Sequence, residues 1–310
     1  MSTESHSLAQ LCAAFAVKRS GYHAWVKAEA GERERTDAQL RPKIRTVFEQ
    51  HKGRYGAPRI QEELAGQGER HGCKRIARLM QAEGLRGCGS RRFVPRTTHS
   101  DHDQPIAPDR LAKAPAPTGP NQTYVTDLTS VWTDEGWLYV AVILDLWSRR
   151  VVGWATAPTL HAQLAMLALQ MAIKHRCPPP GLRHHSDRGG QYACQEYRSL
   201  LRAARMEPGM SAKGNPYDNA TMESFNATYK RECVGLAEAA GGYATRAEAT
   251  LDLFDYAEKY DNRVRRHSAL GYKSPVDFEN QVNQTTHAHR LQGVHQTGSS
   301  PRAIPECDGC

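Results

Sequence analysis

The 310-residue sequence contains no apolar run that approaches the roughly 20 residues needed to cross a bilayer, so we expect no membrane as a partner. It has no Gly-rich phosphate loop of the Walker type, which argues against ATP as a substrate. The apolar stretch over residues 12–17 is too short and too poorly flanked for a secretory signal. With a mean hydropathy of −0.64, these absences indicate a soluble globular protein.

The eight cysteines lack the regular spacing of a disulfide framework. Reduced thiols in a cytoplasmic protein are the simpler interpretation, with Cys194 and Cys233 as core thiols. Two histidines and a Cys-x-x-Cys pair near the C-terminus could hold zinc, but the polar gap between them favours a disordered tail over residues 280–310. Those four residues are His287, His289, Cys307 and Cys310.

The positive charge is concentrated in one part of the chain. Residues 43–98 hold 13 Lys and Arg against five Asp and Glu, which gives +8 and equals the net charge of the whole sequence. A basic module joined to a neutral body suggests a polyanion as its partner, most simply nucleic acid. A solvated basic face without a partner is the alternative.

Periodicity predicts a helical region over residues 1–96, with helices at 8–15, 18–30, 43–51, 59–66 and 73–83. In the last of these, the apolar side chains share one face and the cations Lys74, Arg75 and Arg78 lie elsewhere. A helix, a short turn and a basic helix form the shape of a DNA reader of the helix-turn-helix type. Many three-helix modules share this pattern.

A linker with five prolines is predicted over residues 97–122, followed by a mixed α/β domain over 123–279. Strands are expected at 124–132, 137–144, 150–156 and 182–187, with an extended piece at 207–211. Helices are expected at 161–175, 193–206 and 218–232.

Three acids occupy notable positions in this domain. Asp127 lies within the first strand, Asp187 ends the fourth strand before a Gly-Gly turn, and Glu223 lies in the 218–232 helix. If the first and fourth strands pair in parallel, the two aspartates converge. A carboxylate within a central strand is costly to bury unless it is paired or binds a metal.

Three unrelated surface acids are the alternative to a site. The spacing, with 59 residues between the aspartates and 35 between Asp187 and Glu223, argues against it. Asn226 and Lys230 also share the helix face of Glu223. Carboxylates without histidine or thiolate neighbours favour Mg²⁺ or Mn²⁺. Two such ions about 3.5–4 Å apart can clamp the attacking and leaving oxygens of a phosphoryl displacement.

These acids resemble the D,D(35)E core of transposases and retroviral integrases. The surrounding motifs resemble the second-frame (OrfB-type) product of "family three" bacterial insertion sequences, and the resemblance covers residues 8–278. The motifs are Thr126–Thr129, Asp145–Arg150, His185–Tyr192, Gly214–Ala220, Glu223–Phe225 and Tyr260–Arg263, with Tyr22, Trp25, Tyr55-Gly56 and Arg75–Met80 upstream.

The resemblance implies an α/β fold, an RNase H-like catalytic core with a mixed five-stranded sheet flanked by helices, which follows an all-α helix-turn-helix region. It implies cleavage of element ends and strand transfer with two Mg²⁺ ions, with Mn²⁺ as a substitute. Asp127 and Asp187 would hold both ions and Glu223 the second. We expect DNA contacts from six side chains: Lys74, Arg75, Arg78, Asn226, Lys230 and Arg266.

The expected partners are the terminal inverted repeats of the element and its target DNA, a second copy of the chain on that DNA, and a first-frame product, either separate or fused. The expected location is the bacterial cytoplasm, associated with the nucleoid. Two rival functions stay open: a metal-dependent nuclease that cuts without joining, and a DNA-binding regulator or decayed remnant.

Three further side chains carry alternatives. Asp145 is either a fourth core acid or, as we favour, a brace that pairs with Arg149 or Arg150. One of His184 and His185 should point inward, where packing is favoured over catalysis.

Overall fold

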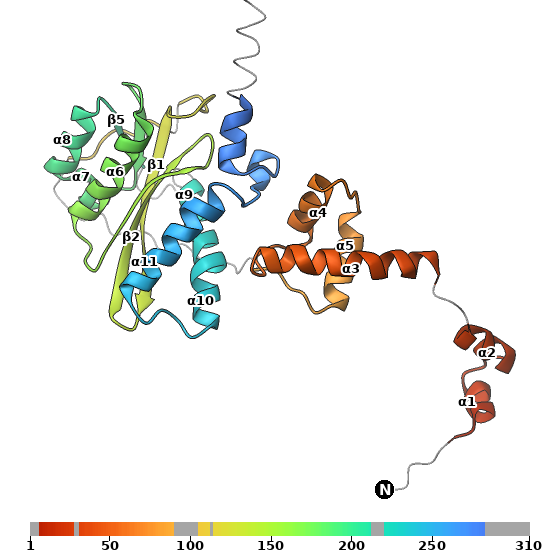
Figure 1. Cartoon of the computed structure of the whole chain (residues 1–310). Coiled ribbons are helices and arrows are strands. Elements are labelled where there is room, and N and C mark those ends of the chain that lie inside the picture. Colours follow the sequence, from red (N-terminus) through yellow and green to blue (C-terminus); the bar gives the residue numbers. More distant parts are fainter. Residues whose placement is uncertain (1–5, 28–30, 90–104, 112–113, 212–219, 283–310) are drawn as a thin grey trace, which may run out of the picture. The chain divides into compact units, whose positions relative to one another are not determined.

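The computed structural model describes residues 6–27, 31–89, 105–111, 114–211 and 220–282. The chain divides into two compact units, Met1–Gly89 and Ser90–Cys310, which are described separately (Figure 1). In the described ranges, no helix has both the length and the apolar character that spanning a membrane would require.

The first unit is entirely helical. Its elements are α1 (Leu8–Ala14), α2 (Arg19–Lys27), α3 (Glu32–Gln50), α4 (Ala57–Gly66) and α5 (Cys73–Ala82). The last three share a core to which α3 gives Leu40, Ile44 and Val47, α4 gives Ile60 and Leu64, and α5 gives Ile76, Leu79 and Met80. Pro58 lies in the first turn of α4, where its missing N–H leaves no helical bond unmade.

Helix α3 begins eleven residues before the predicted helix start at residue 43 and contains Pro42. The prediction followed the apolar side chains, whereas the first half of α3 is highly charged and exposes most of its surface. In that half only Asp37 and Leu40 are buried. A helix whose polar face is this wide shows little apolar periodicity.

The second unit is built on a five-stranded mixed sheet of order β3-β2-β1-β4-β5. The strands are β1 (Thr123–Thr133), β2 (Gly136–Asp145), β3 (Val151–Ala157), β4 (Arg183–Ser186) and β5 (Glu207–Met210). The pairs β1–β2 and β2–β3 are antiparallel, and β1–β4 and β4–β5 are parallel. The predicted parallel pairing of the first and fourth strands is thus confirmed.

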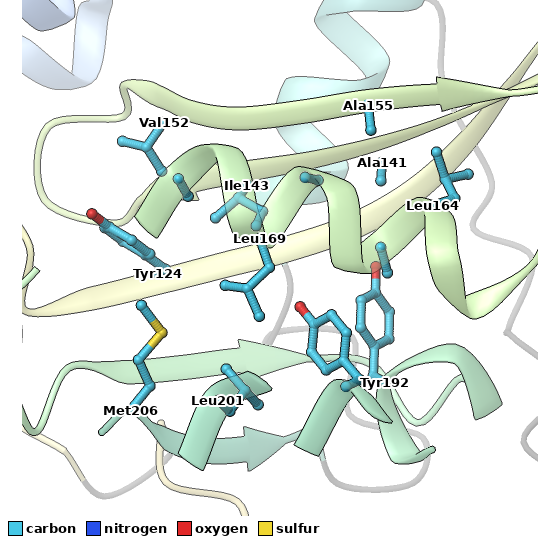
Figure 2. Close-up of a cluster of buried hydrophobic side chains, with 14 of the residues drawn as sticks. Tyr124, Ala141, Ile143, Val152, Ala155, Leu164, Leu169, Tyr192, Leu201 and Met206 are labelled. Carbon is cyan, nitrogen blue, oxygen red and sulfur yellow. The ribbon is translucent and has the colours of Figure 1, made fainter. Parts of the chain in front are cut away.

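One face of the sheet is covered by α6 (Ala162–Arg176), α7 (Gly190–Ala193) and α8 (Gln195–Ala203). Figure 2 shows the core between the sheet and these helices, where Tyr124 and Ile143 of the sheet face Leu169, Leu201 and Met206. Helix α6 approaches β3 closely, because a Cβ at Gly153 would lie 2.3 Å from the carbonyl oxygen of Ala168. The single helix predicted over 193–206 is interrupted at Cys194, whose extended backbone separates α7 from α8.

The opposite face is covered by a longer helical region (Figure 1). It comprises α9 (Ala220–Tyr229), the π-helical η2 (Lys230–Val234), α10 (Gly235–Ala239), α11 (Arg246–Phe254) and the π-helical η3 (Asp255–Asp261). The predicted helix start at Asp218 lies outside the described residues. Our sequence reading assigned no elements to α11 and η3, although they bury Leu253, Tyr256 and Ala257 against the sheet.

The described chain ends in a helix over residues 275–282. Glu279 of this helix accepts hydrogen bonds from Arg150 Nη1 at 2.7 Å and from Arg176 Nη2 at 2.8 Å. The helix therefore extends three residues into the segment predicted as tail, and ion pairs join it to the residue before β3 and to α6. The rest of that tail, including the four residues of the zinc alternative, lies outside the described residues.

Candidate active site

Asp127 lies near the middle of β1, opposite Val142 of β2. Its side chain points to the face covered by α9. The Oδ1 atom accepts from the N–H of Leu128 at 2.9 Å, and Oδ2 accepts from Nδ2 of Asn226 at 2.9 Å. Two hydrogen bonds thus fix the carboxylate within the sheet, as a preformed ligand group requires.

Asp187 directly follows β4, the parallel neighbour of β1. Its Oδ1 accepts from the N–H of Gly189 at 2.9 Å. A Cβ at position 189 would lie 3.0 Å from that oxygen and 2.7 Å from Oε1 of Gln191. A larger residue at position 189 would therefore have to displace the side chain of Gln191 and press on the carboxylate of Asp187.

Glu223 lies in the first turn of α9 and is half-buried. Met222, Phe225 and Tyr229 are buried on the same helix and anchor it against the sheet. Asn226, one turn after Glu223, reaches Asp127, which places α9 directly over the middle of β1. Lys230 is exposed at the start of η2.

The electrostatics of Asp127 show how the three acids act on one another. Burial, and then the negative charges of Asp187 and Glu223, raise the pKa of its carboxyl to about 7, against the hydrogen bonds from Leu128 and Asn226, which lower it. When the pKa of a carboxyl group is raised in this way, a cation bound nearby would lower it again and return the group to its charged form.

The donors fit a hard cation, because carboxylate and amide oxygens dominate and no thiolate is among them. The Oδ1 atom of Asn226 is buried without a hydrogen-bond partner beside Asp127. Across the described ranges, however, no three His, Cys, Asp or Glu side chains gather closely enough to hold a metal ion. Binding a cation between the three acids would therefore require their carboxylates to come closer together than in this structure.

Asp145 is a structural brace, and the predicted arginines contact it through the backbone: the N–H of Arg149 donates to its carbonyl oxygen, and its own N–H donates to the carbonyl oxygen of Arg150. Its carboxylate has other partners. Its Oδ1 accepts from the N–H groups of Trp147 and Ser148, and its Oδ2 accepts from the N–H of Asn121. Neither Arg149 nor Arg150 supplies these bonds. The carboxylate closes the turn between β2 and β3 and is fully buried.

Both histidines of β4 are buried and hydrogen-bonded. His184 Nε2 lies 3.1 Å from the Tyr197 hydroxyl, and His185 Nε2 lies 3.1 Å from Oγ of Ser211. Burial, with His185 adding a smaller contribution, lowers the pKa of His184 to about 3, so its ring is neutral. Packing rather than catalysis accounts for this pair. Of the predicted core thiols, Cys233 is buried and Cys194 caps α8.

The cations predicted to bind DNA have different environments. Lys74 is exposed, whereas Arg75 and Arg78 both pair with Asp37 of α3. Arg266 Nη1 donates to the carbonyl oxygen of Tyr272 at 3.2 Å. The sequence reading missed Asp37, which lies in the charged half of α3. The only signal was its position one turn before Leu40 and two turns before Ile44.

Three family models match the chain. An HTH-like domain covers residues 34–93, and two models described as integrase core domain cover residues 117–216 and 204–275. The 31 kDa protein of insertion element IS600 from Shigella sonnei is 41% identical over 88% of this chain and 99% of its own length. Transposase InsF of insertion sequence IS3A from Escherichia coli K12 is 40% identical over 88% of this chain and 94% of its own. The chain belongs to the IS3 family of insertion-sequence transposases.

Solved structures similar to this transposase include two retroviral ones. A simian T-cell lymphotropic virus intasome, in complex with a PP2A regulatory subunit, covers 81% of this chain and 74% of its own with a TM-score of 0.46 and 16% identity. The catalytic core domain of HTLV-2 integrase in complex with magnesium gives a TM-score of 0.41 and 14% identity over 52% of this chain and 98% of its own.

The transposase is a DDE-type polynucleotidyl transferase that acts in DNA transposition and integration. Its helical first unit contains the HTH-like domain, and its second unit is an integrase core built on the mixed five-stranded sheet. The predicted fold class and function are confirmed.

Proposed function

We propose that Asp127, Asp187 and Glu223 form the catalytic centre, where the transposase cuts the ends of its element and joins them to target DNA. The observation that carries this is the placement of the three acids. Asp127 lies on β1, Asp187 directly follows β4, the parallel neighbour of β1, and the third acid lies on α9, whose Asn226 donates to Asp127.

Each acid has a distinct role in this proposal. Asp127, central and fixed by two hydrogen bonds, and Asp187, held by the N–H of Gly189, would bind both of two Mg²⁺ ions, with Mn²⁺ as a substitute. Glu223 would bind the second ion from α9. The bound ions would lower the pKa of an attacking water or 3′-hydroxyl and stabilise charge on the leaving oxygen. Asn226 would orient Asp127, since its amide already donates to that carboxylate.

The remaining partners are proposed on charge and family membership. Lys230, exposed seven residues after Glu223, would contact a phosphate near the bond that is cut. The DNA would be the terminal inverted repeats and the target, bound by more than one copy of the chain, with a first-frame product either separate or fused. The site of action would be the bacterial cytoplasm at the nucleoid.

Sizing of DNA strands tests this function. The full-length chain is incubated with Mg²⁺, a labelled duplex that carries an element end, and a supercoiled target. Both a shortened labelled strand and a longer joined product are expected, and both should disappear with EDTA. Cleavage without any joined product would contradict the proposed strand transfer and support a simple nuclease activity.

A further inference from the structure

One carboxylate of α3 holds two guanidinium groups of α5. Asp37 is 5% exposed, its Oδ1 accepts from Nε of Arg75 at 2.7 Å, and its Oδ2 accepts from Nη2 of Arg78. Arg75 Nη2 also donates to Oγ1 of Thr36 at 2.8 Å. The bonds from Arg78 and then Arg75 hold the pKa of Asp37 below its usual value. The carboxylate therefore stays charged at neutral pH and keeps both arginines in place.

The same helix carries an exposed stripe. Its apolar side chains face α3 and α4, and the residues on the opposite side are spaced i, i+3, i+4 and i+7, which places them in one row. The exposed row consists of Lys74, Ala77, Arg78 and Gln81. Cationic, amide and methyl side chains in one row are the groups that read base edges in a major groove.

Arg78 belongs to both features, because its side chain is 45% exposed although it is bound to Asp37. We propose that Asp37 is a positioning residue for DNA sequence readout, which holds Arg78 so that its free guanidinium edge reads a guanine in the major groove. This inference rests on the proposed DNA binding by α5.

The chemistry of the pair supports this role. An arginine has five N–H donors, and Arg78 directs only Nη2 at the carboxylate. Two parallel N–H groups are left to donate to O6 and N7 of guanine, and the fixed guanidinium loses less rotamer freedom when it binds.

Asp37 has a second, opposite effect on affinity. Its negative charge lies between two positive ones and reduces their attraction for the phosphates of any DNA, whatever its sequence. Asp37 is therefore expected to lower general affinity while it raises selectivity. If the carboxylate only joined α3 to α5, its removal would not raise general affinity while lowering selectivity.

Selection followed by titration tests the inference. The full-length wild-type chain first enriches a library of duplexes with a random central segment. The enriched duplex and a scrambled duplex of equal composition are then titrated over a range of salt with wild type, Asp37→Asn and Glu83→Gln. Glu83 is the matched control because it accepts from two arginines of α3, Arg41 and Arg45, and also joins α3 to the end of α5.

For Asp37→Asn we expect tighter binding of the scrambled duplex, a salt dependence steeper by up to about 0.9 in log–log slope, and loss of about ten-fold in the ratio between the two duplexes. Glu83→Gln should keep the wild-type ratio. Replacing the key guanine with 7-deazaguanine should weaken wild type about ten-fold and leave Arg78→Ala unaffected.

Other outcomes overturn the inference. If Asp37→Asn keeps the ratio, or weakens binding to both duplexes in step with a fall in melting temperature, Asp37 is a structural staple. If the wild type binds both duplexes but enriches no sequence, the stripe does not read bases. If the wild type binds neither duplex, the DNA-binding proposal itself fails.

Discussion

Asn226 of α9 donates from its Nδ2 to Oδ2 of Asp127 in β1 across 2.9 Å. This bond joins the helix that carries Glu223 to the strand at the centre of the sheet. The sequence predicted that Asn226 contacts DNA, and the structure shows that it also contacts an acid of the candidate site. With its amide nitrogen directed at a carboxylate, Asn226 is placed to orient that acid, and its contact with DNA stays a prediction.

Removing this amide should affect cleavage and leave DNA binding intact. We expect Asn226→Ala to lower the cleavage rate about 10- to 100-fold and to raise the Mg²⁺ concentration required, because Asp127 loses an orienting hydrogen bond. Ser224→Ala, at an exposed position of the same helix, is the control. A loss of DNA affinity equal to the loss of cleavage would instead support a DNA contact.

His184 should make stability depend on pH. Its folded-state pKa is about 3. Between about pH 6.5 and 3, His184 is therefore protonated in the unfolded chain and neutral in the folded chain. This contribution to stability is complete above pH 6.5 and is lost as the pH falls toward 3, by up to about 1.4 kcal/mol per pH unit.

Denaturant unfolding of wild type and His184→Gln between pH 6 and 4 measures this dependence. The variant should show the shallower slope, and His175→Gln, at an exposed position of α6, should match wild type. Equal slopes for His184→Gln and wild type would show that the ring is charged in the folded protein.

A buried ion pair holds the two π-helical segments together. Arg265 donates from Nε and Nη2 to the two carboxylate oxygens of Glu232, at 2.7 and 3.1 Å, and its Nη1 lies 3.5 Å from Oδ1 of Asp261. Arg265→Leu should cost about 3–5 kcal/mol of unfolding free energy because two carboxylates stay buried. Glu232→Gln should cost less, since Asp261 still faces the arginine. The reverse order would contradict this account of the charges.

The C-terminal boundary can be placed by truncation. Removal of residues 283–310 should leave folding and cleavage unchanged, because that segment is polar with few apolar side chains. Removal from residue 275 should lower the melting temperature by several degrees, because Arg150 and Arg176 lose Glu279. One bound zinc per chain that disappears on the shorter truncation would instead support the zinc alternative for the tail.

The sequence predicted the sheet well because period-two patterns and turn residues mark β1, β2 and β3 clearly. The parallel neighbours β1 and β4 followed from topology, which brought Asp127 and Asp187 to adjacent elements. The sequence did not predict the helices α11 and η3, because a charged surface and a π-helical turn blur the 3.6-residue period of apolar side chains. The ion-pair partners of individual side chains were harder still to predict from the sequence. Nothing in the local sequence distinguishes an arginine that faces solvent from Arg78. The partner of Arg78 is Asp37, which lies forty-one residues earlier in the chain.

Strand cleavage by charge-removing variants of the three acids tests the central claim most directly. Asp127→Asn, Asp187→Asn and Glu223→Gln keep the shape of each side chain but remove a metal-binding charge. Each should lower Mg²⁺-dependent cleavage of an element end by about 100-fold or more, with DNA affinity close to wild type. Glu238→Gln, at an exposed position of α10, should cut at the wild-type rate. A variant of any of the three acids that still cuts DNA near the wild-type rate would contradict the assignment of that acid to the catalytic centre.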